Sequence, residues 1–144
     1  MKRTLTVLVV DDCAAMRTLV GTILVAGGHI VLLAEDVARA LEILDRRQPD
    51  LILTDYSMPG GNGADLVREI RSRDAFAHTP VFVVSSEQAP ETRNRMASAG
   101  ANGWISKPLC VETLLAAVDA VAVSFVPPAE VFRASRMPAA LEVA

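Results

Sequence analysis

Polar side chains that could carry chemistry occur at the ends of four short apolar runs in this sequence. They are Asp11, Asp12, Asp55, Ser85, Ser86 and Lys107. Carboxylates held in one crevice repel one another, and a hard divalent cation such as Mg²⁺ removes that penalty. Beside such a cation a carboxylate can attack phosphorus as a nucleophile, while an ammonium group neutralises the equatorial phosphate oxygens. The set therefore indicates metal-assisted phosphoryl transfer if the fold brings these residues together.

Each of these residues also has an ordinary structural explanation. An aspartate or serine that follows a strand is commonly a turn or helix cap, and Lys-Pro is a common surface dipeptide. Their joint occurrence at successive strand ends favours a shared site over separate caps. Zinc is not indicated, because no histidine or cysteine has suitable spacing. His29 and His78 fall at predicted helix–strand and loop positions, and we assign them surface or packing roles.

Short apolar strands alternate with amphipathic helices five times along the chain. The predicted strands are residues 4–10, 30–34, 51–54, 81–84 and 103–106. The predicted helices are residues 13–26, a helix capped by Asp36, and residues 64–73, 90–99 and 111–123. A loop rich in proline and glycine follows Asp55. The alternation predicts an α/β fold with a parallel sheet and helices on both faces. Ligand sites of such sheets lie beyond the carboxyl ends of the strands, where the polar residues occur.

Size and composition agree with one domain of this class. The chain has 144 residues, half of them apolar, which is enough for a hydrophobic core. A net charge of -3 gives no reason to expect nucleic acid or an anionic membrane as a direct partner. No apolar run reaches the length of a membrane span, and residues 4–10 lead into Asp11 without an export cleavage site. Cys13 and Cys110 lack paired spacing, which indicates reduced thiols and a cytoplasmic protein.

The end of the chain differs in character from the rest. Pro127 and Pro128 interrupt the last predicted helix, and Pro138 follows in a segment too short for a second folded domain. We therefore expect one domain over residues 1–124, followed at 125–144 by a C-terminal extension or the start of a linker.

Four segments resemble the motifs of the response-regulator receiver domain. They are DD in VLVVDDCAAMR, D in LILTDYSMPGGNG, S in VFVVSSE and K in GWISKP. The likeness is strongest to stand-alone, chemotaxis-type receivers and covers most of the chain. It implies a flavodoxin-like (βα)5 doubly wound parallel sheet with strand order 2-1-3-4-5.

The resemblance also implies a role for each member of the acidic cluster. Asp55 would be the phosphate acceptor, and Lys107 would pair with the bound phosphate. Mg²⁺ would be held directly by Asp12, by Asp55 and by the backbone carbonyl of Ser57. Asp11 would contact the cation through water.

Two further positions match the family's conformational switch. Ser85 corresponds to the residue whose hydroxyl turns toward the phosphate. Trp104 stands where the family carries an aromatic ring that rotates inward, although a fixed packing role is the alternative because indole is larger than the usual ring. The bond between Lys107 and Pro108 is expected to be cis. Glu87 matches a position that tunes the dephosphorylation rate.

The function implied is that of a single-domain response regulator in a two-component phosphorelay, not of an enzyme. A sensor histidine kinase or a histidine phosphotransfer protein would donate the phosphoryl group to Asp55. The fourth helix, fifth strand and fifth helix would then shift between two packings and be recognised by a downstream protein. Catalysis would be limited to self-phosphorylation and slow self-dephosphorylation, and a phosphorylation-dependent dimer is left open.

Two other functions stay open from the sequence. A pseudo-receiver would bind proteins without accepting phosphate, but such modules usually lack one of the acidic pair, the acceptor or the lysine, and all are present here. A phosphohydrolase of the haloacid dehalogenase type also forms an aspartyl phosphate. Its nucleophile follows the first strand, with a second aspartate two residues later, whereas Asp11 and Asp12 are adjacent and the best nucleophile follows the third strand.

Overall fold

In the computed structural model, which describes residues 3–58, 60–87 and 89–123, five parallel strands form one sheet. These strands are β1 (Thr6–Val10), β2 (Ile30–Ala34), β3 (Leu51–Thr54), β6 (Val81–Ser85) and β7 (Gly103–Ser106). The helices are α1 (Ala14–Ala26), α2 (Val37–Leu44), α3 (Gly63–Ser72), α4 (Pro90–Ala99) and α5 (Val111–Val123), with a short 3-10 helix η1 (Asp74–Phe76). The strand order is β2-β1-β3-β6-β7, which confirms the expected doubly wound sheet and its 2-1-3-4-5 order.

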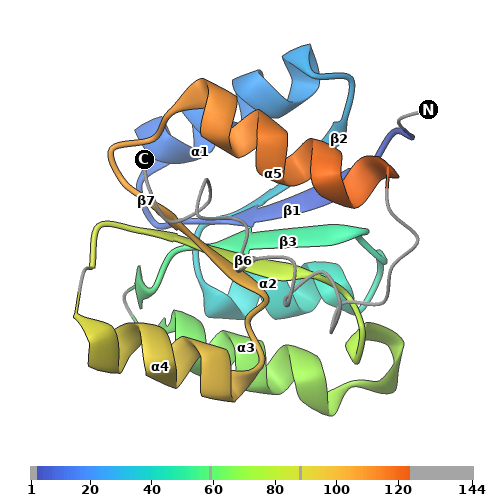
Figure 1. The fold of residues 1–144 in the computed structure, drawn as a ribbon. Coiled ribbons are helices and arrows are strands. Elements are labelled where there is room, and N and C mark those ends of the chain that lie inside the picture. The colour runs from blue at the N-terminus through green and yellow to red at the C-terminus, as the bar shows by residue number, and fades with distance from the viewer. Residues whose placement is uncertain (1–2, 59, 88, 124–144) are drawn as a thin grey trace.

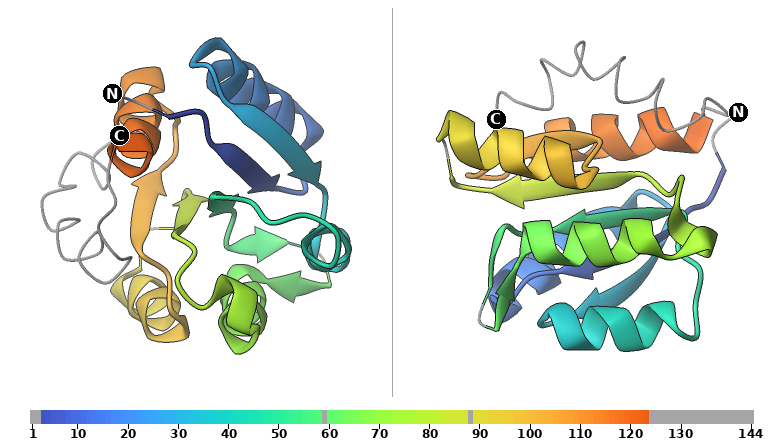
Figure 2. Two further views of the ribbon diagram at one scale, coloured as in Figure 1. Left: turned by 90° about the vertical axis from the view of Figure 1, so that its right-hand side faces the viewer. Right: turned by 90° about the horizontal axis from the view of Figure 1, so that it is seen from below.

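The sheet separates two hydrophobic cores. Helices α1 and α5 cover one face, and α2, α3 and α4 cover the other (Figure 1, Figure 2). Successive side chains of a strand point to opposite faces. In β1, Val7 and Val9 therefore pack in the core under α1 and α5, whereas Leu8 and Val10 pack in the core with α2 and α3. Burial on both faces explains why the central strands are continuous apolar runs.

Two strands differ slightly from their predicted bounds, and pairing with a neighbour explains both differences. The first strand begins at Thr6 instead of residue 4, because its partner β2 begins at Ile30, directly opposite Thr6. Strand β6 includes Ser85, one residue more than predicted, because Ser85 pairs with Ser106 of β7. The extra residue brings the Ser85 hydroxyl to the carboxyl end of the sheet.

Helix starts are determined by the residues that satisfy the free backbone N–H groups. Asp36 caps α2 as predicted, since its side chain accepts a hydrogen bond from the backbone N–H of Arg39. Helix α1 begins one residue later than predicted, at Ala14, because Cys13 has extended backbone geometry. Helix α3 covers Gly63–Ser72 instead of 64–73, because Asn62 caps it.

The segment after Asp55 was predicted as a loop, and this description is incomplete. It contains a small antiparallel hairpin of β4 (Ser57–Met58) and β5 (Gly61–Asn62). Met58 is buried against the core beneath it, which anchors the hairpin. Strands of two residues are too short to show the apolar alternation by which longer strands are predicted.

Gly63, the first residue of α3, lies against the backbone that carries Asp55. A Cβ atom at Gly63 would lie 2.5 Å from the carbonyl oxygen of Asp55 and 3.1 Å from the Cα of Tyr56. The Gly63→Ala variant is therefore expected to lose about 2–3 kcal/mol of unfolding free energy, because backbone must move to relieve the overlap. The measurement is the urea midpoint followed by circular dichroism.

Gly21 of α1 provides the matched control for this prediction. A Cβ atom there would make only ordinary contacts of 3.8 Å with Leu33 and Val31. Gly21→Ala should keep or raise the stability, by up to about 1 kcal/mol, because alanine favours helix. Equal urea midpoints for Gly63→Ala and the unaltered chain would contradict the steric argument.

Within the described residues, no helix has the length and apolar composition needed to cross a membrane. Cys13 is exposed, Cys110 is partly buried, and both are free thiols. The predicted extension at 125–144 lies outside the described residues, so its assignment as a separate segment stays a prediction.

Candidate functional site

Three carboxylates meet at the carboxyl end of the sheet. Asp11 and Asp12 follow β1, and Asp55 follows β3, whose last residue pairs with the last residue of β1. One oxygen atom from each carboxylate lies within 4.8 Å of the other two. Asp11 is buried, Asp55 is partly buried and Asp12 is exposed. The cluster predicted from sequence is therefore formed by residues of two adjacent parallel strands.

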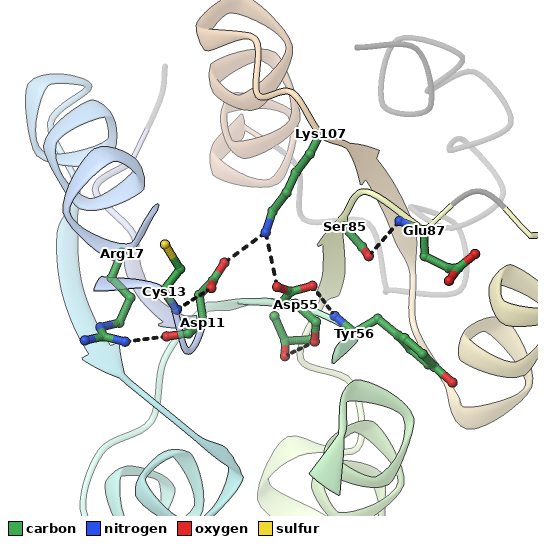
Figure 3. A network of polar contacts seen from close by, with 9 residues as sticks. Asp11, Cys13, Arg17, Asp55, Tyr56, Ser85, Glu87 and Lys107 are labelled. Atoms are coloured by element: carbon green, nitrogen blue, oxygen red, sulfur yellow. Dashed lines mark hydrogen bonds and ion pairs between the residues drawn. The ribbon is translucent and has the colours of Figure 1, made fainter. Parts of the chain in front are cut away.

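The ammonium group of Lys107, which follows β7, reaches between two of these carboxylates (Figure 3). Its Nζ atom lies 3.1 Å from Oδ2 of Asp55 and 3.3 Å from Oδ2 of Asp11. Burial disfavours the charged amine, but the negative charges and hydrogen bonds of Asp55 and Asp11 outweigh this, so the pKa of Lys107 is raised above its ordinary value. The amine is thus held protonated as the counter-charge of the site.

Backbone donors hold the carboxylates of Asp11 and Asp55 in place. Oδ1 of Asp55 accepts a hydrogen bond of 2.7 Å from the backbone N–H of Tyr56, and Oδ1 of Asp11 accepts one of 2.9 Å from the N–H of Cys13. In both aspartates the other oxygen, Oδ2, is the one that faces Lys107. The orientation of each carboxylate is therefore fixed by a backbone N–H on one oxygen and by Lys107 on the other. The sequence could not indicate the backbone contacts, because every residue type except proline carries a main-chain N–H.

The hydroxyl group of Ser85 takes part in the loop that leads into α4. Oγ of Ser85 accepts a hydrogen bond of 3.1 Å from the backbone N–H of Glu87 (Figure 3). The Glu87 carboxylate in turn accepts one of 3.0 Å from the N–H of Ala89, directly before α4. Ser86, the other candidate hydroxyl, is exposed. Any movement of the Ser85 hydroxyl would therefore change the hydrogen bonds of the loop that leads to the start of α4.

The side chain of Trp104 in β7 is buried in one of the two cores. It is only 5% exposed and belongs to the core that contains Met96 of α4. The guanidinium carbon of Arg93, also in α4, lies 5.3 Å from the centroid of the indole ring, within cation–π distance. The indole Nε1 atom is buried and has no hydrogen-bond partner among the residues that the structure describes. Trp104 thus joins β7 to α4 but leaves one buried donor unsatisfied.

Tyr56 is a residue of the site that the sequence analysis did not single out. Its backbone N–H binds the Asp55 carboxylate, and its phenol oxygen accepts a 2.9 Å hydrogen bond from Nη1 of Arg95 in α4. The signal that could have found it is an aromatic residue directly after the best candidate nucleophile. Asp55 is therefore connected to α4 through one residue.

Other predicted features have simple outcomes. The peptide bond between Lys107 and Pro108 is cis, as expected. Ser57 lies in β4 with an exposed side chain, two residues after Asp55. His29 is buried, and its Nδ1 accepts a hydrogen bond of 3.1 Å from the backbone N–H of Leu5, which confirms a packing role.

Comparison with known proteins identifies the family to which this fold belongs. The family model described as the response regulator receiver domain matches residues 7–119. The chain belongs to this family. Receiver domains are signalling modules of two-component systems and not classical enzymes, which decides against the phosphohydrolase alternative.

The relatives of this receiver domain include both small and large proteins. The chain is 34% identical over 122 residues to the chemotaxis protein CheY-3 of Vibrio cholerae, covering 84% of this chain and 94% of that protein. It is 40% identical over 116 residues to the gliding motility regulatory protein of Myxococcus xanthus, of which it covers 15%. The solved structure of the chemotaxis response regulator CheY4 of Vibrio cholerae has a TM-score of 0.78 and 32% identity, covering 83% of this chain and 99% of that one. The expected likeness to chemotaxis-type receivers is confirmed.

Receiver domains bind Mg²⁺ at an acidic pocket, and the residues of this receiver fit that ion. Mg²⁺ prefers oxygen ligands, and the three clustered aspartates present carboxylate oxygens without competing histidine or cysteine ligands in the cluster. The ammonium group of Lys107 contacts two of these carboxylates and therefore competes with the cation for them.

Replacement of Lys107 by methionine is expected to tighten Mg²⁺ binding by about threefold to tenfold. The ammonium group neutralises the carboxylates of Asp11 and Asp55, so its removal increases their attraction for a cation. The measurement is a calorimetric Mg²⁺ titration of both proteins. Arg68→Met on α3, where Arg68 is an exposed cation paired with Asp65, is the control and should leave the affinity unchanged. Weaker binding by the Lys107 variant would show that the lysine does not compete with the ion.

Proposed function

We propose that this chain is a response regulator that accepts a phosphoryl group on Asp55. The observation that carries the proposal is the convergence of three carboxylates and one ammonium group at the carboxyl end of the sheet. Asp55 is the best nucleophile because its partly buried carboxylate is flanked by Asp11 and contacted by Lys107. It also occupies the acceptor position of the receiver motif.

The proposed reaction is a phosphoryl transfer from phosphohistidine on a histidine kinase or phosphotransfer protein. A carboxylate oxygen of Asp55 forms a bond to phosphorus as the bond from phosphorus to the histidine nitrogen breaks. Asp12, Asp55, the backbone carbonyl of Ser57 and, through water, Asp11 would hold Mg²⁺, which would supply positive charge for the phosphate oxygens. Lys107 pairs with the phosphate on Asp55. Its contacts with the carboxylates of Asp11 and Asp55 are then replaced by a contact with the phosphoryl group.

The proposed switch involves Ser85 and Trp104. The Ser85 hydroxyl leaves the backbone N–H of Glu87 and turns toward the phosphate, which changes the loop before α4. The Trp104 ring then moves into the vacated space. Its present position supports the idea of two states, because a buried indole N–H that has no partner among the described residues costs about 1–3 kcal/mol. Phosphorylation would shift the balance between these packings, and the face formed by α4, β7 and α5 would carry the change to a downstream protein.

The surroundings of this reaction follow from its chemistry. Because histidine kinases take their phosphate from ATP, the proposed exchange takes place in the cytoplasm.

The chain would catalyse only its own phosphorylation and slow dephosphorylation. Its phosphorylated form could pair with a second copy through the face formed by α4, β7 and α5. We assign the receiver unit to residues 1–124, with 125–144 as a C-terminal extension or the start of a linker.

The proposal is tested by incubating the purified protein with acetyl phosphate and Mg²⁺. We expect intact-mass spectrometry to show the addition of one phosphoryl group, which chelation of the metal prevents. Trp104 is the only tryptophan in the sequence, so its fluorescence should change in the same samples. A protein that binds Mg²⁺ but gains no phosphoryl group would instead be a pseudo-receiver, and the proposed function would be wrong.

A further inference from the structure

The edge strand β2 has an unusual surface for its position. No strand pairs with its outer side in the part of the chain that the structure describes, and Figure 2 shows it at the margin of the sheet between α1 and α2. Exposed edges are commonly protected from other chains by charged residues, proline or bulges. The sequence of β2 is IVLLA, without any of these. Ile30 and Leu33 are 52% and 46% exposed, whereas β3 and β6 are fully buried.

A groove of about 510 Å³ lies between this edge and α2. Its apolar lining comes from residues 31–33 of β2 and from Ile43 of α2. The charged lining consists of Arg39, Glu42, Arg46 and Arg47, in and directly after α2. The groove is thus apolar along the strand and charged along the helix.

The charge of the groove is positive, although the whole chain has a net charge of -3. Arg39 is engaged with Glu42 at 2.9 Å. Among residues 3–58, 60–87 and 89–123, the exposed side chains of Arg46 and Arg47 have no ion pair or hydrogen bond. Both follow the last turn of α2, where a cation is favoured by the helix dipole. That effect explains the two charges but not the exposed apolar strand beside them.

We propose that this groove binds an extended, acidic segment of a partner protein, which pairs as an added strand with the free edge of β2. Alternate side chains of the added strand would face opposite sides of the sheet. Those on the α2 side would meet Arg46 and Arg47 and should be acidic. Those on the other side would lie beside Leu33, which is near α1, and should be apolar. The expected ligand therefore alternates acidic with aliphatic residues.

A second copy of this chain suits the groove less well. If two copies paired symmetrically through their β2 edges, the groove of one copy would lie against the groove of the other. The excess of arginine in each groove would then repel the arginines of the other. An acidic partner removes that repulsion. The surface consists of β2 and α2, not of the Asp55 site, so the inference does not depend on phosphorylation.

The probe for this inference is a short synthetic peptide in which glutamate alternates with valine. We expect weak binding by fluorescence anisotropy, with amide NMR shifts concentrated in β2 and α2 and an affinity that falls as salt is added. The double variant Arg46→Glu, Arg47→Glu should bind about tenfold more weakly, because two attractive contacts become repulsive. A peptide with lysine in place of glutamate should not bind. Asp55→Asn should bind as the unaltered chain does, which separates this result from the fate of the phosphorylation proposal.

Arg68→Glu, a charge reversal at an exposed position of α3, is the matched control and should keep full affinity. Equal affinity of the double variant and the unaltered chain would overturn the proposal, as would amide shifts confined to elements other than β2 and α2. Sedimentation that shows a dimer with shifts confined to β2 would assign this edge to a second copy and would also overturn it.

Discussion

Asp55→Asn is expected to abolish phosphorylation of this receiver domain by acetyl phosphate, with a loss on the order of a hundredfold or more. Asparagine keeps the shape of the side chain, and its oxygen can still accept the hydrogen bond from the N–H of Tyr56. It lacks the anionic oxygen that would attack phosphorus in the proposed reaction and that contacts Lys107. The variant should therefore fold normally and lose only the acceptor. The measurement is the stoichiometry of phosphoryl addition by intact-mass spectrometry.

The control is a carboxylate far from the site. Asp74 is exposed in η1, which precedes the amino end of β6, so Asp74→Asn should be phosphorylated like the unaltered chain. Undiminished addition in Asp55→Asn would contradict the assignment. Borohydride reduction and peptide mapping would then show whether Asp11 or Asp12 carries the phosphoryl group.

Asp12→Asn is expected to weaken Mg²⁺ binding by about tenfold to a hundredfold. Of the three clustered carboxylates, that of Asp12 is the exposed one. Among the described residues its side chain makes no hydrogen bond or ion pair that would stabilise the fold. Its charge is therefore expected to matter more for the binding of the ion than for stability, whereas Asp11 is buried and bonded to Cys13 and Lys107. The urea midpoint should change by less than the equivalent of about 0.5 kcal/mol.

Calorimetric titration with Mg²⁺ measures this effect, and a phosphorylation assay extends it. If the charge of Asp12 acts through the ion, a large excess of Mg²⁺ should restore much of the phosphorylation rate. Asp74→Asn again serves as the control, and it should bind Mg²⁺ normally. An unchanged Mg²⁺ affinity in Asp12→Asn would remove Asp12 from the metal site.

The amino-acid sequence by itself determined the five strands of the main sheet, the five α-helices and the identity of the polar residues, but not the small β4–β5 hairpin. Apolar runs with β-branched residues, separated by amphipathic segments, are local patterns, so the strands and helices could be predicted to within about two residues. The cap at Asp36 is also local, because donor and acceptor are three residues apart. The receiver motifs were recognisable because each lies at the end of one strand.

Only the tertiary structure decided how these residues meet. Lys107 is 96 residues from Asp11 and 52 from Asp55 along the chain, and their contact exists because parallel strands from distant segments end at one edge. The burial of Trp104 under Arg93 depends on where α4 packs. The exposure of β2 depends on its place at the margin of the sheet, since its composition resembles that of the buried strands. Local periodicity reports which face of an element is apolar, but strand order and helix packing arise from contacts between distant residues, so they are not contained in any single segment.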